Sequence, residues 1–349
     1  MNDHRKTFIA FVKLGDFLRE FCNSNPSENE WHDSFREVIS LAKHHNGWFT
    51  KENIHFALKG WSEILTEEKL SLWLSKYNLQ ENKPITVALI MAGNIPIVGF
   101  HDFLSVLITG NKVLAKLSSN DKALLPLIAK YLIEIEPFLK DKIIFTEEKL
   151  ESFDAVIATG SNNTARYFEH YFSKGPNIIR RNRNSVAVLT GNETTEQLTA
   201  LGEDIFRYYG LGCRSVSKLF VPTGYDFDTF FKAIYEFNPL IQQAKYANNY
   251  DYNKAVYLMS EFKILENGFL MLKEDESYAS PIASVFYETY NSSEELKEKL
   301  KNEEEKIQCI VAKGFVENEI PFGKTQTPEL NDYADGVDTV DFLLKTSQI

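Results

Sequence analysis

Apolar side chains in the first 80 residues recur at the spacing of amphipathic helices. Phe8 and Phe11 are three residues apart, and Ile54 and Leu58 are four apart, so each pair lies on one face of a helix. Polar residues fill the positions between them. We therefore expect residues 1–80 to form a helical segment, and we find no recognisable motif in it.

Beyond residue 84 the pattern changes to short apolar runs that alternate with helical stretches. Residues 85–91 are continuously apolar, as in a parallel strand that is covered on both faces. Further strands are predicted at 113–116, 142–145 and 155–158, and helices at 98–108, 121–134 and 164–171. This alternation predicts an α/β fold with a doubly wound parallel sheet.

The second half of the chain continues as a mixture of helices and strands. A helix over 193–209 leads to a short apolar strand at 217–221, which Pro222 ends. After it we expect helices at 227–237, 241–246 and 293–306, and strands at 269–272, 283–287 and 308–311. The pattern beyond Pro222 is therefore a mixture of helices and strands.

Composition narrows the class of protein. The 349 residues are 44% hydrophobic and 25% charged, which is typical of a soluble globular chain of about two domains. A net charge of -11 argues against general nucleic-acid binding. No apolar run reaches the ~18 residues of a membrane span. We therefore expect no membrane span and no nucleic-acid partner.

The cysteine and histidine patterns bear on compartment and metal binding. The three cysteines Cys22, Cys213 and Cys309 cannot form a disulfide framework, which fits a reducing cytoplasm. The chain has no Cys-x-x-Cys and no His-x-x-x-His. We therefore expect no metal site.

Cys213 lies between the helix at 193–209 and the strand at 217–221, where a glycine break separates the two. Gly210 and Gly212 can end the helix, because glycine takes the left-handed cap freely. Positive charge from Arg207 and Arg214 favours the thiolate, which is the nucleophilic form of cysteine. The stretch makes Cys213 a candidate nucleophile.

Two other interpretations of this stretch exist. A lone cysteine is more often an inert core residue than a nucleophile. The letters Gly-Leu-Gly-Cys-Arg-Ser at 210–215 also half-match a dinucleotide fingerprint. That motif needs a strand before it and a helix after it, and the order here is reversed, so we reject it.

Several short motifs follow one another in a distinctive order. They are Gly-Asn-Ile-Pro at 93–96, Thr-Gly-Asn-Lys-Val-Leu-Ala-Lys-Leu-Ser-Ser at 109–119, Ala-Thr-Gly-Ser at 158–161, Gly-Cys at 212–213 and Pro-Phe-Gly at 321–323. In order and spacing they resemble the aldehyde dehydrogenase superfamily. Within it, the chain most resembles the LuxC-like acyl-CoA reductases, which reduce a fatty acyl group to an aldehyde with NADPH.

The resemblance, which spans roughly residues 85–344, implies the fold and the division of the chain. It implies an aldehyde-dehydrogenase-like α/β fold with a parallel-sheet cofactor domain and an α/β catalytic domain. Residues 1–80 would be an N-terminal helical segment and 81–205 an NADP(H)-binding Rossmann-like domain. Residues 206–325 would form the catalytic domain, and 326–349 a C-terminal returning segment.

The resemblance also implies roles for single residues. Cys213 would be the thiol that becomes acylated. Asn94 would offer its amide to the developing oxyanion, with the backbone N–H of Cys213 as a second donor. Gly323 would belong to a returning segment beside the substrate. The alternative for Asn94 is a plain turn-forming role.

Further residues are expected at the cofactor. The resemblance implies that Lys116 holds the adenosine ribose, and that Gly160 and Ser161 lie at the pyrophosphate, where a helix N-terminus suits an anion. Ser118 and Ser119 supply hydroxyl donors for a 2′-phosphate, and no carboxylate follows the strand within this stretch. We therefore expect NADPH as the cofactor. The alternative for Lys116 is a solvated strand end.

The chain departs from the superfamily pattern at two places. Arg180 stands where aldehyde-oxidising members carry a general-base Glu, so the acyl-enzyme should not be hydrolysed readily. No matching Glu of a Glu-x-Phe-Gly-Pro pattern precedes Pro281. Arg180, Arg181 and Arg183 have two open interpretations, a solvated turn or a site for CoA phosphates.

The sequence therefore predicts a cytoplasmic acyl-CoA reductase that uses NADPH and takes acyl-CoA as its substrate. Alternatives on the same fold are an acyl-phosphate reductase and an aldehyde dehydrogenase. A non-catalytic binding subunit is a third. The length of the acyl chain and the formation of a homo-oligomer are left open by the sequence.

Overall fold

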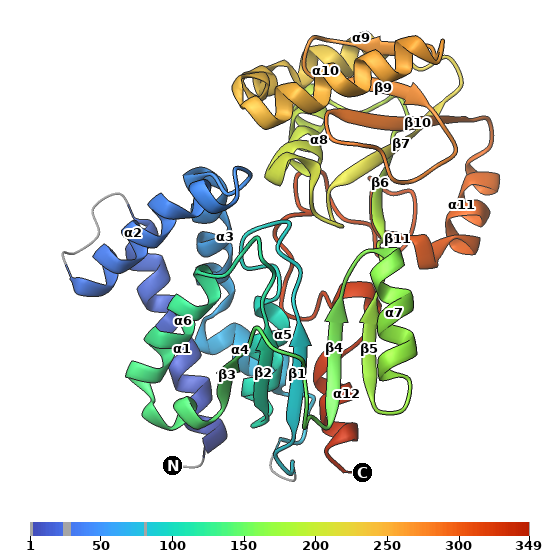
Figure 1. Ribbon diagram of the computed structural model, residues 1–349. Helices are drawn as coiled ribbons and strands as arrows, with labels where there is room; N and C mark the ends of the chain where they lie inside the picture. The colour runs from blue at the N-terminus through green and yellow to red at the C-terminus, as the bar shows by residue number, and fades with distance from the viewer. Residues whose placement is uncertain (1–2, 24–28, 80–81, 349) are drawn as a thin grey trace. The chain divides into compact units, whose positions relative to one another are not determined.

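The computed structural model describes residues 3–23, 29–79 and 82–348. The chain forms two compact units, Met1–Arg181 with Glu329–Ile349 and Asn182–Pro328, which Figure 1 shows in the colours of the chain. The expected division by function placed its boundaries after residues 80, 205 and 325. That division remains a prediction, and each unit is described by itself below.

The first unit contains four N-terminal helices, a sheet with its helices, and the C-terminal helix. Its elements are α1 (Asp3–Cys22), α2 (Glu30–His45), α3 (Lys51–Ile64), α4 (Glu67–Leu74), β1 (Thr86–Ile90), α5 (Phe100–Ile108), β2 (Lys112–Lys116), α6 (Leu124–Ile135), η1 (Pro137–Asp141), β3 (Ile143–Phe145), β4 (Ala155–Thr159), α7 (Asn162–Phe172), β5 (Asn177–Arg180), η5 (Ala334–Gly336) and α12 (Thr339–Thr346). These elements include the strands and helices that the sequence pattern predicts between residues 85 and 171.

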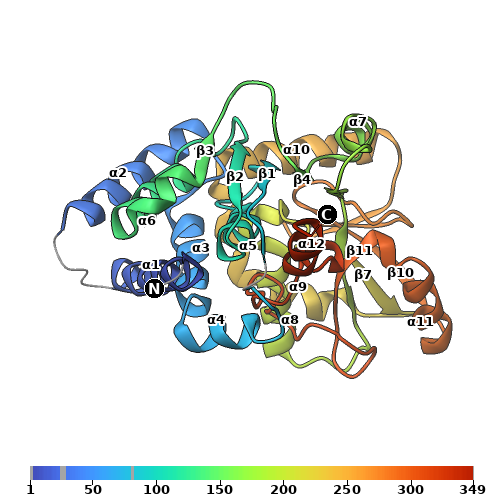
Figure 2. The same ribbon diagram turned by 90° about the horizontal axis from the view of Figure 1, so that it is seen from below.

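The five strands of the first unit are all parallel and follow the order β3-β2-β1-β4-β5. This order confirms the predicted doubly wound sheet. Figure 2 shows α5 and α12 on one side of the sheet and α7 on the other. The strand order reverses at β1, because β2 and β3 follow on one side of it and β4 and β5 lie on the other. Ligands bind beside such a switch point, past the carboxyl ends of the strands.

The N-terminal helices begin at residues that cap them. The side chain of Asn29 accepts from the backbone N–H of His32 at 2.8 Å, and Thr50 and Thr66 accept in the same way at α3 and α4. Phe11 and Leu58 are buried on the inward faces of α1 and α3. The expected helical segment is therefore present within the described residues.

The C-terminal segment returns to the first unit and is held there by polar contacts. The Trp73 indole donates to the hydroxyl of Tyr333 at 2.7 Å, and the Tyr77 hydroxyl donates to Asp338 at 2.6 Å. The burial and the Asp338 contact raise the pKa of Tyr77 well above its usual range, so this hydroxyl stays protonated.

The second unit is built on a six-stranded sheet. Its elements are β6 (Asn184–Val188), α8 (Thr195–Phe206), η2 (Arg207–Gly210), β7 (Val216–Pro222), α9 (Phe227–Ala233), η3 (Tyr235–Gln242), α10 (Ala244–Met259), β8 (Ile264–Glu266), β9 (Met271–Glu274), β10 (Ser284–Tyr290), α11 (Ser293–Asn302), η4 (Glu304–Lys306) and β11 (Ile307–Val311). The order is β11-β6-β7-β10-β9-β8, and only β8 runs antiparallel to its neighbour.

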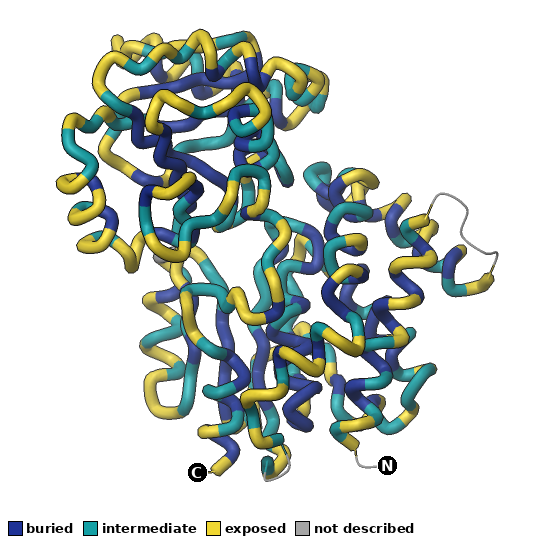
Figure 3. Tube along the Cα trace, turned by 180° about the vertical axis from the view of Figure 1, so that it is seen from behind, coloured by how far each residue is buried: buried dark blue, intermediate teal, exposed yellow. Residues whose placement is uncertain are grey.

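Both faces of this sheet are covered. Leu219 and Val221 pack with α8 and α9 on one face, while Phe220 packs with α11 on the other. Figure 3 shows the strands as largely buried and the helices as alternating between buried and exposed positions. Continuous apolar runs are the expected sequence of such two-sided strands.

A lysine interrupts the apolar core of β7. Lys218 is fully buried, and its Nζ donates to the carbonyls of Asp275 and Glu276 at 3.1 and 2.8 Å and to Glu288 at 2.7 Å. Ser217 donates to the carbonyl of Tyr278 at 2.7 Å. Side chains of β7 thus hold the segment that follows β9 against the sheet.

The largest difference from the predicted pattern is α10, a sixteen-residue helix where the sequence indicated a short one at 241–246. Its buried face is made of Tyr246, Tyr250, Asn253 and Tyr257. Tyrosine and asparagine carry little apolar signal, so the helical spacing of this face is weak in the sequence. Packing against the sheet stabilises the helix instead.

Candidate functional site

The turn after β1 lies against the segment after β2. An added Cβ at Gly93 would come within 2.6 Å of both the Cβ and the Oγ of Ser118, so only glycine fits there. Asn94 follows in the same turn and is half-buried, with its Oδ1 shielded from solvent. The structure therefore brings together two of the segments that the sequence assigns to the cofactor and the oxyanion.

Asp121 fixes this turn and also the start of α6. Its Oδ2 accepts from the backbone N–H of Ile97 at 3.1 Å, and its Oδ1 accepts from that of Leu124 at 3.3 Å. Ile97 takes a φ of 49°, in the left-handed region, which is costly for a β-branched residue. The contact with Asp121 helps to hold this conformation. Burial raises the pKa of Asp121, against the effect of its hydrogen bonds.

Lys116 ends β2 and reaches the loop that follows β3. Its Nζ donates to the backbone carbonyl of Glu148 at 3.1 Å, and Lys122 pairs with Glu147 at 2.5 Å. Ser118 is half-buried and Ser119 is exposed beside them. Glu147 and Glu148 therefore lie at this edge of the sheet, and because they are about thirty positions after Lys116, the local sequence does not indicate them.

Gly160 and Ser161 connect β4 to α7. Ser161 is the N-cap of α7, and its Oγ accepts from the backbone N–H of Thr164 at 3.3 Å. An added Cβ at Gly160 would lie 3.0 Å from the Cβ of Thr164, so the glycine lets the turn pack closely on the helix. The N-terminus of α7 opens at the carboxyl end of β4, where backbone N–H groups and the helix dipole favour an anion.

Cys213 lies in the second unit, in the loop between η2 and β7, and it is the exposed one of the three cysteines. Cys309 is buried on β11, and burial raises the pKa of the Cys22 thiol to about 11. A thiol with such a pKa is almost fully protonated at neutral pH and is a poor nucleophile. The exposure of its side chain therefore makes Cys213 the best candidate nucleophile among the three cysteines.

The backbone before Cys213 turns sharply. Helix α8 ends at Phe206, and Tyr208, Tyr209 and Gly210 then take φ values of 55°, 59° and 75°. The helix thus ends earlier than the glycine break predicts, because two tyrosines already adopt the left-handed conformation. The carbonyl of Cys213 accepts from the Ser185 hydroxyl at 3.0 Å, which ties the loop to β6.

Both arginines expected near the thiol have other partners. Arg207 pairs with Glu203 one turn earlier at 2.7 Å. The Nε of Arg214 donates to the backbone carbonyl of Thr325 at 2.5 Å. The carboxylate of Glu203 balances the charge of Arg207, and Arg214 connects the loop of Cys213 to the segment around Gly323.

A buried carboxylate that no sequence motif indicates holds that segment in place. Asp204 accepts from the backbone N–H groups of Gly323 and Thr325 at 2.6 and 2.9 Å, and from the Thr325 hydroxyl at 2.9 Å. Burial raises the pKa of Asp204, although these bonds favour the charged form. The sequence does contain one indication of this buried role, since Asp204 is an acidic residue among the apolar residues of α8, next to Ile205.

Gly323 lies beside α8 at a point where no side chain fits well. It takes a φ of 78°, and an added Cβ would approach the Cβ of Ala200 to 3.0 Å. Together with the bonds of Asp204 and Arg214, this close packing places the segment of Gly323 next to the loop of Cys213. The structure thereby brings together two motifs that are 110 residues apart in the chain.

Arg180 has an environment that neither open interpretation anticipated. It is buried at the end of β5, where its two Nη atoms donate to the carboxylate of Asp102 and one of them also reaches Thr339 at 3.3 Å. Arg181 is exposed and pairs with Glu169. Arg180 is therefore neither a solvated turn residue nor a donor for CoA phosphates.

The site residues are thus distributed over the two units. Asn94, Lys116, Ser118, Ser119, Gly160 and Ser161 belong to the first, and Cys213 belongs to the second. In the ranges 3–23, 29–79 and 82–348, no helix is long and apolar enough to cross a membrane. The same ranges contain no group of three or more His, Cys, Asp or Glu residues placed to hold a metal ion.

Solved structures with the same fold include several aldehyde dehydrogenases. KauB of Pseudomonas aeruginosa matches with a TM-score of 0.65 at 12% identity, over 89% of this chain and 72% of its own. Aldehyde dehydrogenase 21 of Physcomitrella patens, in complex with succinate, matches with a TM-score of 0.69 at 12% identity, over 99% and 84%. The Bacillus cereus aldehyde dehydrogenase in complex with NAD⁺ matches with a TM-score of 0.61 at 14% identity, over 89% and 72%. These similarities confirm the expected fold.

No curated protein matches the sequence. A family model described as acyl-CoA reductase (LuxC) matches residues 36–236, which is more than half of the chain and includes every candidate site residue up to Cys213. The chain therefore belongs to the LuxC family of acyl-CoA reductases.

Proposed function

We propose that this member of an oxidoreductase family acting on acyl or aldehyde groups reduces acyl-CoA to the aldehyde with NADPH, through a thioester on Cys213. The observation that carries the proposal is the position of Cys213. It is the exposed cysteine, it lies in a tight loop between η2 and β7, and hydrogen bonds hold the Gly323 segment beside that loop.

The acyl-transfer step uses residues of the chain alone. The thiolate of Cys213 attacks the carbonyl carbon of the acyl-CoA, a new C–S bond forms, and the bond to the CoA sulfur breaks. CoA leaves as a thiolate and takes up a proton. The amide of Asn94 and the backbone N–H of Cys213 would donate to the carbonyl oxygen as negative charge develops on it.

The residues at the carboxyl ends of β1, β2 and β4 fit a nicotinamide dinucleotide. Gly93 has no room for a Cβ beside Ser118, and the N-terminus of α7 at Ser161 suits a pyrophosphate. Lys116, Ser119 and Gly160 complete the set that would hold the cofactor. NADPH, when bound, supplies the hydride that reduces the thioester. NAD⁺ in the Bacillus cereus relative supports a nicotinamide cofactor here.

The environment of Arg180 supports reduction rather than hydrolysis. Arg180 stands at the position where aldehyde-oxidising members of the superfamily carry a general-base Glu, and its guanidinium is buried against Asp102. A paired, permanently protonated guanidinium cannot take a proton from water. We therefore expect the thioester to persist until it is reduced or returned to CoA.

Mass spectrometry of the intact protein tests this function. The protein is incubated without reductant with acyl-CoAs of several lengths and, separately, with acyl phosphates. We expect an acyl adduct on the native protein and on Cys309→Ala, and none on Cys213→Ala. An adduct that forms from acyl phosphate but not from acyl-CoA would indicate that the protein is an acyl-phosphate reductase. The complete absence of an adduct would favour the non-catalytic subunit.

A further inference from the structure

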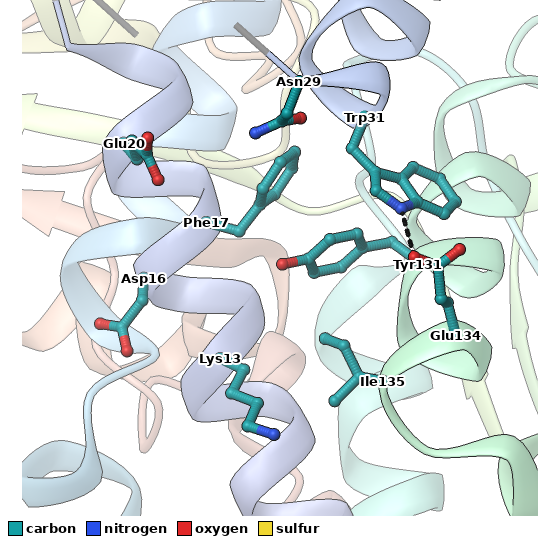
Figure 4. Close-up of a pocket in the computed structure, with 9 residues that line it drawn as sticks. All are labelled: Lys13, Asp16, Phe17, Glu20, Asn29, Trp31, Tyr131, Glu134 and Ile135. Carbon is teal, nitrogen blue, oxygen red and sulfur yellow. Dashed lines mark hydrogen bonds between the residues drawn. The ribbon is translucent and has the colours of Figure 1, made fainter. Parts of the chain in front are cut away.

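The N-terminal helices form a pocket that the proposed reaction does not use. It has a volume of about 500 Å³ and lies where α1, the start of α2 and the last turn of α6 meet (Figure 4). All of its lining residues belong to the first unit. We name it the α1–α6 pocket.

The sequence builds one wall of the pocket from a single face of α1. Lys13, Asp16, Phe17 and Glu20 follow the helical spacing of three and four residues, so their side chains project in the same direction. Figure 4 shows Phe17 between the two acidic side chains of this wall and the ring of Tyr131.

Three aromatic rings are fixed against one another in the pocket. The rings of Phe17 and Tyr131 stack with their centroids 4.2 Å apart, and Trp31 meets Tyr131 edge to face at 5.2 Å. The Trp31 indole N–H donates to Glu134 at 2.8 Å, which orients both side chains. The pocket is therefore a built arrangement of rings rather than a gap between loose side chains.

Negative charge converges on these rings. Asp16, Glu20 and Glu134 line the pocket together with one cation, Lys13. Arg19 forms an ion pair with Asp16 from outside at 2.7 Å, so the carboxylates of Glu20 and Glu134 supply most of the unbalanced negative charge. Burial raises the pKa of Tyr131 to about 12, and the charges of these three carboxylates add to the rise. An anionic ligand is disfavoured by this field, and a cation is favoured.

We propose that the α1–α6 pocket binds an organic cation that carries a guanidinium or ammonium group on an apolar stem. The cation would be attracted by the carboxylates and by the part-exposed rings of Trp31 and Tyr131, and its stem would pack against Ile135. A guanidinium suits the site best, because it is planar, stacks on rings and binds carboxylates through two N–H groups.

Fluorescence titration of the full-length protein tests the proposal, because Trp31 lines the pocket. The probes are N-acetyl-arginine amide and butylguanidinium. N-acetyl-citrulline amide serves as a neutral ligand of nearly the same shape. We expect a saturable change with the cations at millimolar concentration and none with the citrulline compound. Saturation by butylguanidinium would show that a free small cation is enough to occupy the pocket. Saturation by the arginine amide alone would show that the ligand is an arginine side chain carried by a peptide.

Variants locate the binding. Glu134→Gln should raise the dissociation constant about two- to fivefold, as expected for an exposed ion pair. Trp31→Phe should abolish the fluorescence change. Glu67→Gln, an exposed acid on α4 outside the pocket, is the matched control and should change nothing. An equal response to the citrulline compound, or an equal effect of Glu67→Gln and Glu134→Gln, overturns the proposal, as does the absence of saturation by any probe.

Discussion

Arg180 and Asp102 form a buried two-point ion pair that joins β5 to α5. Nη2 of Arg180 donates to Oδ1 of Asp102 at 2.8 Å, and Nη1 donates to Oδ2. Only about a tenth of either side chain is exposed. The pair lies entirely within the first unit and connects α5 to the sheet that carries the proposed cofactor residues.

Removing one member of this pair should be more harmful than removing both. Asp102→Ala leaves a guanidinium buried without its carboxylate, and we expect the free energy of unfolding to fall by about 3–5 kcal/mol. The double variant Asp102→Leu with Arg180→Met should lose much less. Urea unfolding followed by circular dichroism measures both. The exposed pair of Arg36 and Asp33 is the control, and Asp33→Asn should cost less than about 1 kcal/mol. Additive losses in the double variant would contradict this account.

The amide of Asn94 is expected to act in the acyl-transfer step. Asn94→Ala should lower the turnover rate about 10²–10³-fold, since the loss of one oxyanion donor has an effect of that size. The thermal midpoint should change little, because the residue lies in a half-buried turn. Pre-steady-state release of CoA measures the step directly. A loss of less than about threefold would show that Asn94 only shapes the turn.

Cofactor choice should depend on Ser119, which is exposed beside Lys116 at the end of β2. We expect the native protein to bind NADPH at least as well as NADH. Ser119→Glu should shift the preference toward NADH by about tenfold, because an added carboxylate repels the 2′-phosphate.

Titration of both cofactors by fluorescence provides the measurement for Ser119. Ser173→Glu, at the other end of α7, adds the same charge and should leave the ratio unchanged. At this edge Lys122 is paired with the carboxylate of Glu147, whereas Lys116 contacts the backbone carbonyl of Glu148. Much tighter binding of NADH than of NADPH by the native protein would refute the expectation.

Acid should weaken the second unit partly through Asp275. Burial alone would raise the pKa of this carboxyl, but its bonds to Lys273 and Ser277 outweigh burial and lower the pKa to about 2. A folded pKa below the unfolded value of about 3.9 means that the charged carboxylate stabilises the fold above pH ~4. The shift corresponds to at most about 2.6 kcal/mol, and solvent screening of this partly exposed group reduces it to about 1–2 kcal/mol, which is lost as the pH falls from about 4 to about 2.

Unfolding experiments across this pH range compare the native protein with Asp275→Asn, which should lack that part of the pH dependence. The comparison is needed because Asp121 and Asp204 act in the opposite sense. Burial raises the pKa of each, so their contribution to stability decreases as the pH rises through the acidic range. If the free energy of unfolding changes with pH equally in the two proteins, Asp275 does not contribute to the loss of stability in acid.

Features that depend on a few neighbouring residues were predictable from the sequence. The apolar run at 85–91 became β1, and the polar turns Gly93–Asn94 and Gly160–Ser161 lie at strand ends as expected. The order of the motifs was enough to indicate the family. Periodicity, turn chemistry and motif order are all written within short stretches, so each can be read without knowing what packs against it.

Contacts between distant parts of the chain were decided only by the tertiary structure. Arg180 meets Asp102 across 78 positions, and the segment of Gly323 meets Asp204 across 119. Local sequence holds no information about which strand ends become neighbours, and a buried charge takes whichever partner the packed fold provides. The same reason applies to the α1–α6 pocket, whose two main walls are more than a hundred residues apart in the sequence.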